Sequence, residues 1–146
     1  MLDDKDLKIL SHLRSNSRKS VTEISKAVGM PVTTVFDRIR SREQDVIERY
    51  TCLLNFKRLG FHTNARIALK VAMKDDFEEY ITKHPAVNSV EKIDMGYDYM
   101  IHVVFKDIEG LRGFLEDIDR FGIEEKRVYH VIDDVEKEKV FAIKNK

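Results

Sequence analysis

The sequence contains little cysteine, proline or glycine, has no tryptophan and shows no excess of either charge. Cys52 is its single cysteine among 146 residues, so no internal disulfide can form, and we expect a reducing, cytoplasmic compartment. Two prolines and six glycines exclude collagen-like or long low-complexity segments. With no apolar run of about 18 residues and an acidic N-terminus, we predict neither a membrane span nor a signal peptide.

The zero net charge is a cancellation between two parts of the chain. Residues 1–61 carry twelve Lys or Arg against eight Asp or Glu, whereas residues 62–146 carry fourteen against eighteen. The first part therefore has a formal charge of +4 and the second a charge of −4. Because a basic patch on one module is the electrostatic signature of a nucleic-acid binder, the split modestly favours a DNA-binding first part.

The first part reads as three short helices. Two capping boxes are predicted, Asp3 with Asp6 and Ser20 with Glu23, and Gly29 can end the second helix in the left-handed conformation. Apolar residues recur at helical spacing, which predicts an inward face on each helix. These residues are Leu7, Leu10 and Leu13 with Ile9 alongside, then Val21, Ile24, Ala27 and Val28, then Val32, Val35, Phe36 and Ile39.

The second part alternates with a period of two in several segments, which predicts strands. The strands are expected at 46–55, 65–73, 87–94, 99–105, 127–132 and 139–143, and helices at 74–83 and 108–121. After the first strand, the order β-α-β-β-α-β predicts a ferredoxin-like sandwich. The fold class is therefore α+β: a helix-turn-helix (winged-helix-like) domain over 1–45, a strand linker and hinge over 46–61, and a ferredoxin-like domain over 62–146, to which only the family resemblance given below assigns ligand sensing and oligomerisation.

Residues able to catalyse a reaction are not grouped in the sequence. The five histidines are scattered, Cys52 has no partner for a zinc site, and there is no phosphate-binding or dinucleotide loop. No catalytic, metal or cofactor site is predicted.

The segment from Ser20 to Arg42 has the pattern of a helix-turn-helix with its recognition helix second. Thr33 and Thr34 can bond bases or touch a thymine methyl, while arginines that follow can reach phosphates or guanine edges. The residues predicted to contact DNA are Arg18, Lys19, Thr22, Thr33, Thr34, Asp37, Arg38 and Arg40.

These features together resemble the Lrp/AsnC family (leucine-responsive, or feast/famine, regulators) over nearly the whole chain. The residues that carry the resemblance are Leu2-Asp3…Asp6…Ile9-Leu10…Leu13…Asn16-Ser17-Arg18, Glu23-Ile24…Ala27-Val28-Gly29…Thr34-Val35…Arg38-Ile39, Val46-Ile47…Tyr50, Leu59-Gly60, Pro85…Val87 and Gly96-Tyr97-Asp98. Two departures stand out: Pro31 replaces the serine that usually caps the recognition helix, and the segment after that helix is shorter.

The resemblance implies a transcriptional regulator that binds double-stranded DNA without enzymatic activity. It implies a homodimer paired through the strand at 46–55, with further assembly such as an octamer. It also implies an amino acid or related metabolite bound between sensing (RAM) domains near Gly96, Tyr97 and Asp98. Two alternatives stay open: an enzyme like the sirohaem decarboxylases, which share this architecture, and a small-molecule sensor that does not bind DNA.

Overall fold

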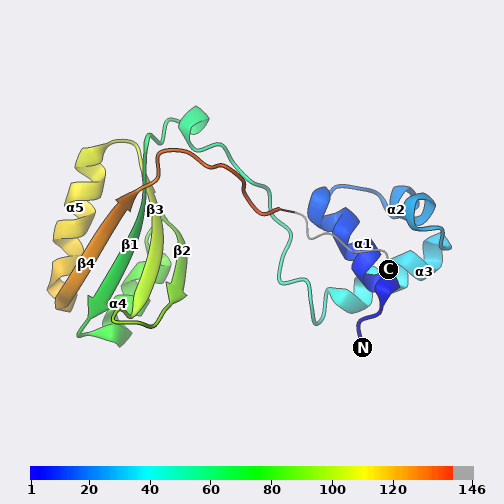
Figure 1. The fold of residues 1–146 in the computed structure, drawn as a ribbon, viewed down its shortest axis with the longest axis horizontal. Coiled ribbons are helices and arrows are strands. Elements are labelled where there is room, and N and C mark those ends of the chain that lie inside the picture. Colours follow the sequence, from blue (N-terminus) through cyan, green and yellow to red (C-terminus); the bar gives the residue numbers. More distant parts are fainter. Residues whose placement is uncertain (140–146) are drawn as a thin grey trace. The chain divides into compact units, whose positions relative to one another are not determined.

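A computed structural model describes residues 1–139 of the chain (Figure 1). The chain divides into two compact units, residues 1–53 with 136–139, here called the helical unit, and residues 54–135, the sheet unit. The segment 46–61, predicted as a linker, is thus shared between the units, and the domain boundaries expected at 45 and 61 stay a prediction. Apart from Lys139, the strand predicted at 139–143 lies outside the described residues.

The helical unit consists of α1 (Asp4–Ser15), α2 (Val21–Val28) and α3 (Val32–Arg42). Both predicted capping boxes are confirmed. The Asp3 and Ser20 side chains each accept a hydrogen bond from the third amide of their helix, and their own amides donate to the side chains of Asp6 and Glu23. Gly29 ends α2 at φ 67°, a left-handed conformation that costs glycine little. Pro31 precedes α3 and supplies no side-chain cap.

The core of the helical unit contains fewer buried residues than the helical spacing predicts. The fully apolar cluster consists of Ile9, Ile24, Val35 and Ile39, and the three leucines of α1 are only half-buried. The inward assignment was wrong for Ala27, Val32 and Phe36, which are exposed. Three short helices cover only one stripe of each other, so residues at the margin of the predicted stripe remain in solvent.

The sheet unit has the predicted ferredoxin-like order of elements. It contains β1 (Thr63–Val71), α4 (Lys74–Lys83), β2 (Val87–Lys92), β3 (Tyr99–Phe105), α5 (Ile108–Ile118) and β4 (Ile123–His130), with short 3₁₀ turns η1 (Lys57–Leu59) and η2 (Asp119–Phe121). The four strands form one antiparallel sheet in the order β2-β3-β1-β4 (Figure 1). Strand β4 begins at Ile123 rather than at the predicted 127, because Gly122 at φ 70° turns the chain directly into it.

One face of the sheet carries the core of this unit. Across the sheet, Ile67 lies opposite both Ile101 and Val128, so apolar side chains from neighbouring strands meet on the same face. Phe77 of α4 and Phe114 of α5 belong to the same buried cluster, so both helices cover that face. The result is a two-layer sandwich.

The strand predicted at 46–55 is not a strand within this chain. Turns occupy residues 43–46, and residues 47–55 have no regular secondary structure. A strand requires a hydrogen-bonded partner, which alternation in the sequence cannot supply. Tyr50, Leu53 and Leu54 in this segment are about half exposed. No helix within residues 1–139 combines the length and apolar character needed to cross a bilayer.

Candidate nucleic-acid interface

The turn between α2 and α3 is held by short-range contacts. The Ser25 hydroxyl donates a hydrogen bond to the carbonyl of Met30, and the Met30 amide donates to the Ser25 carbonyl at 3.2 Å. Ile24 and Val35, both fully buried, place α2 against α3. The arrangement is the helix-turn-helix expected from the sequence, with α3 in the position of the recognition helix.

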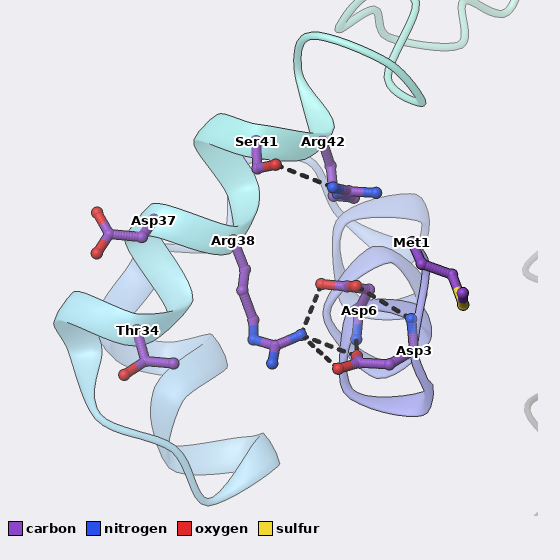
Figure 2. Close-up of a pocket in the computed structure, with 8 residues that line it drawn as sticks. All are labelled: Met1, Asp3, Asp6, Thr34, Asp37, Arg38, Ser41 and Arg42. Atoms are coloured by element: carbon purple, nitrogen blue, oxygen red, sulfur yellow. Dashed lines mark hydrogen bonds and ion pairs between the residues drawn. The ribbon is translucent and has the colours of Figure 1, made fainter.

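Arg38 points from α3 back to the N-terminus of α1 (Figure 2). Its Nη1 donates to Asp3 Oδ1 at 2.8 Å and to Asp6 Oδ1 at 2.9 Å, and the Asp6 side chain is only 5% exposed. These three residues are called the Arg38 clamp below. The Asp6 amide and then the Arg38 guanidinium lower the pKa of Asp3, while the two carboxylates raise the pKa of Arg38. The clamp fixes the recognition helix to α1.

The opposite side of α3 faces away from the clamp. The side chains of Asp37 and Arg38 diverge from the helix (Figure 2). Of the predicted contacts on α3, Thr33, Asp37 and Arg40 are exposed, whereas Thr34 is half-buried. Thr34 and Asp37 line a shallow open hollow of about 400 Å³ together with the clamp, so Asp37 lies at the border between the two sides. Thr33, Asp37 and Arg40 recur at spacings of four and three residues, so they share one face of the helix.

The predicted DNA contacts around the start of α2 differ in their solvent exposure and in whether their side chains already have partners. Arg18 and Thr22 are exposed, and the Arg18 amide donates to Asn16 Oδ1 at 3.0 Å. Lys19 is half-buried, with its Nζ 3.1 Å from His12 Nδ1. Arg18 and Thr22 therefore present side chains to solvent, while Lys19 is already engaged with α1.

Phe36 is a residue of the exposed α3 face that the sequence pattern misplaced. Its side chain is 49% exposed, and the Arg40 guanidinium lies 5.9 Å from the centre of its ring. The spacing of Phe36 from Thr33 and Arg40, three residues and four, is the signal that could have placed it on this face.

The turn between β2 and β3, predicted to bind a ligand, is built around Asp98. Its Oδ2 accepts a hydrogen bond from the Val71 amide at 2.9 Å, and its Oδ1 lies 3.1 Å from Lys74 Nζ. The Val71 amide is the largest cause of a lowered Asp98 pKa, followed by Lys74. Gly96 is exposed at φ 100°, and Tyr97 is half-buried. The Asp98 carboxylate is thus already bonded where β1 changes register with β4.

Within residues 1–139, no three His, Cys, Asp or Glu side chains are grouped so that they could hold a metal ion.

A helix-turn-helix joined to a ferredoxin-like sandwich defines a class of two-domain, DNA-binding regulators, and comparison with known proteins identifies the family. The model of the AsnC-type helix-turn-helix domain matches residues 2–41, and the model of the Lrp/AsnC ligand binding domain matches residues 65–141. The chain belongs to the Lrp/AsnC family of transcriptional regulators. The resemblance drawn from the sequence is confirmed.

Relatives of similar length carry the same description. An uncharacterised HTH-type transcriptional regulator of Pyrococcus abyssi is 32% identical over 94% of this chain and 96% of its own length. The HTH-type transcriptional regulator FL11 of Pyrococcus furiosus is 32% identical over 80% of this chain and 79% of its own. This chain is accordingly a transcriptional regulator of the Lrp/AsnC type.

Solved structures share the fold over nearly the full length. A transcriptional regulator of Neisseria meningitidis, solved as a complex with L-Met, superposes with a TM-score of 0.89 at 22% identity and covers 97% of both chains. LrpC of Bacillus subtilis gives a TM-score of 0.86 at 22% identity, covering 93% of this chain and 98% of its own. The predicted fold class is confirmed.

Proposed function

We propose that this regulator binds double-stranded operator DNA in the cytoplasm as a homodimer, and that it acts by binding rather than by catalysis. The outward face of α3 would enter the major groove, with Thr33, Asp37 and Arg40 toward base edges. Arg18 and Thr22 at the start of α2 would contact the backbone. The observation that carries this proposal is the exposed polar face of α3, which the Arg38 clamp leaves free on a firmly held helix.

The clamp changes the role proposed for one residue. Arg38 Nη1 is bonded to two carboxylates, so we assign Arg38 to positioning α3 rather than to a phosphate. Lys19, next to His12, and Thr34, in the hollow beside the clamp, stay proposed contacts at the margin of the interface. Of the arginines predicted to contact DNA, Arg18 and Arg40 have exposed positions.

The dimer is proposed to form through residues 46–55. Their backbone has no strand partner among the described residues, and Leu53 and Leu54 are 58% and 49% exposed. Pairing this segment with its copy would bury these side chains and present two α3 helices as a symmetric pair. Assembly beyond the dimer, such as an octamer, is part of the same proposal.

An amino acid is the proposed effector, bound near Gly96 and Tyr97. The L-Met complex of the Neisseria meningitidis regulator supports this class of ligand. Because the Asp98 carboxylate already holds Val71 and Lys74, its role would be to shape the turn, while exposed backbone beside Gly96 contacts the ligand. Binding that differs between two assemblies would shift their populations.

The test begins with selection of duplexes from a random DNA pool, with and without a mixture of amino acids. Fluorescence anisotropy then gives the dependence of log K on log salt for the selected duplex. We expect Arg18→Ala, at a proposed backbone contact, to weaken binding and to reduce the salt slope by about 1. Arg40→Ala, at a proposed base contact, should weaken binding and relax the base preference at one position of the duplex. A selected duplex without two-fold symmetry would contradict the dimer.

Lys83→Ala is the matched control, since it removes an exposed cation from the sheet unit. It should leave affinity and slope unchanged. If no duplex is enriched under either condition, the DNA-binding proposal is wrong. An absorbance of a tetrapyrrole in the purified protein would instead favour the enzyme alternative.

A further inference from the structure

Two large apolar side chains lie exposed on the recognition helix. Val32 is 44% exposed and Phe36 is 49% exposed, one helical turn apart on α3. Single exposed apolar side chains are common on protein surfaces, so the exposure of Phe36 alone does not mark a contact, and its neighbours on the helix must be considered.

The surroundings of the ring point to a polar, charged partner rather than to another apolar protein surface. Phe36 lies on the same face of α3 as Thr33 and Arg40, with Asp37 at the border of that face, and all of them are exposed. The Arg40 guanidinium lies 5.9 Å from the ring centre, within the range of a cation–π contact. An apolar ring flanked by a donor, an acceptor and a cation matches the mixed chemistry of the major groove.

Thymine is the base whose major-groove edge carries a methyl group, and phenylalanine side chains contact that methyl. A guanidinium presents a planar fork of donors, which suits the two acceptors of guanine. Four residues of a helix rise about 6 Å, which is under two base-pair steps of 3.4 Å. Phe36 and Arg40 would therefore reach base edges within about two base pairs of each other.

We propose that Phe36 determines the sequence specificity of this regulator by contacting the 5-methyl group of a thymine, with Arg40 reading a guanine beside it. The inference rests on the proposed function, because it requires α3 to enter the major groove. It adds a base identity and a residue that the predicted set of DNA contacts lacks.

The test replaces each thymine of the selected duplex, one at a time, with deoxyuridine, which pairs identically and lacks only the methyl group. For the wild-type protein we expect one thymine in each half-site at which the replacement weakens binding about fourfold, the factor that corresponds to burying one methyl group. Phe36→Ala should bind the thymine duplex more weakly and should no longer distinguish deoxyuridine at that position. Phe36→Leu, which keeps an apolar contact, should retain part of the discrimination.

Tyr129→Ala is the matched control, since it removes a ring that is 51% exposed from β4 of the sheet unit. It should distinguish the two bases as the wild type does. Because Phe36 is half in solvent, Phe36→Ala should fold, which its melting curve checks.

Three results separate this inference from the proposed function. If the wild type binds the selected duplex with the expected salt slope but tolerates deoxyuridine everywhere, the Phe36 inference is wrong and the proposed function stands. If Phe36→Ala keeps the discrimination and changes the sedimentation coefficient instead, the ring contacts protein and the inference is wrong. If no duplex is selected, both are wrong.

Discussion

Each of the two units is stabilised internally by a different kind of interaction. The sheet unit buries thirteen residues in one cluster, among them Phe77, Tyr99, Phe114 and Phe121. The helical unit buries a cluster of four aliphatic residues. A small unit that buries so little apolar surface has a small free energy of unfolding. Hydrogen bonds and ion pairs therefore supply a larger share of its stability. The Arg38 clamp and two capping boxes supply those contacts in the helical unit.

Replacing a buried isoleucine with alanine in each core should give the largest loss of stability. Ile24 and Ile67 are both fully buried, so Ile24→Ala and Ile67→Ala should each destabilise their own unit by about 2–5 kcal/mol. We expect Ile24→Ala to unfold the helical unit and abolish DNA binding, whereas the sheet unit survives Ile67→Ala. Hydrogen exchange measured peptide by peptide distinguishes the units. If each variant lost hydrogen-exchange protection in its own unit to the same extent, the two units would not differ in stability as expected.

Removing the clamp should have the next largest effect. In Arg38→Ala the buried Asp6 carboxylate loses its cation, so α1 and α3 should both lose protection from hydrogen exchange. DNA affinity should fall while the salt slope is retained, because Arg38 is assigned to positioning. Arg18→Ala is the comparison, since Arg18 is a proposed backbone contact, so its loss should reduce the slope and leave the exchange pattern unchanged. A reduced slope in Arg38→Ala would return Arg38 to the set of phosphate contacts.

Loss of a helix cap should have a smaller effect, confined to the helical unit. Ser20 accepts a hydrogen bond from the Glu23 amide at 3.1 Å. Ser20→Ala should therefore destabilise this unit by about 1 kcal/mol. Urea unfolding followed by hydrogen exchange in α2 measures the change, and Ser20→Thr, which keeps the hydroxyl, should restore most of it. No change in α2 would show that the polar contacts matter less than proposed.

The smallest expected effect is the loss of stability of the sheet unit at low pH. The Val71 amide lowers the pKa of Asp98 in the folded sheet unit, so the unfolded state takes up a proton first as the pH falls. The contribution of Asp98 to stability is therefore complete above its unfolded pKa of about 3.9 and is lost below it. Urea titrations at a series of pH values below about 4 measure the free energy of unfolding. It should fall more steeply with decreasing pH for the wild type than for Asp98→Asn. Parallel curves would contradict this assignment.

Local signals in the sequence predicted local structure well. The caps at Asp3 and Ser20 and the helix end at Gly29 are confirmed, because each depends on contacts within a few residues. The strand Tyr99–Phe105 and the helix Lys74–Lys83 have the predicted bounds, because they lie in a large core that enforces their period.

Features that depend on distant partners could not be predicted. Helical spacing shows the direction of an apolar stripe but not its width, which depends on how many elements cover the helix, and Phe36 was misplaced for that reason. The partner of Arg38 is 35 residues away in the sequence, and no local pattern marks it. Alternation over 46–55 indicated a strand, yet the described residues contain no strand partner for this segment, and its pairing with a second copy is a proposal.

The division of α3 into a clamped side and an open side has a consequence for how such a regulator could acquire new targets. Arg38 and Val35 hold the helix in place, while Phe36, Asp37 and Arg40 make no contribution to the buried cluster. Under the proposed function, changes on the open side would redirect the protein to other promoters at little cost in folding. Target choice and structural stability would then depend on separate residues of a single eleven-residue helix.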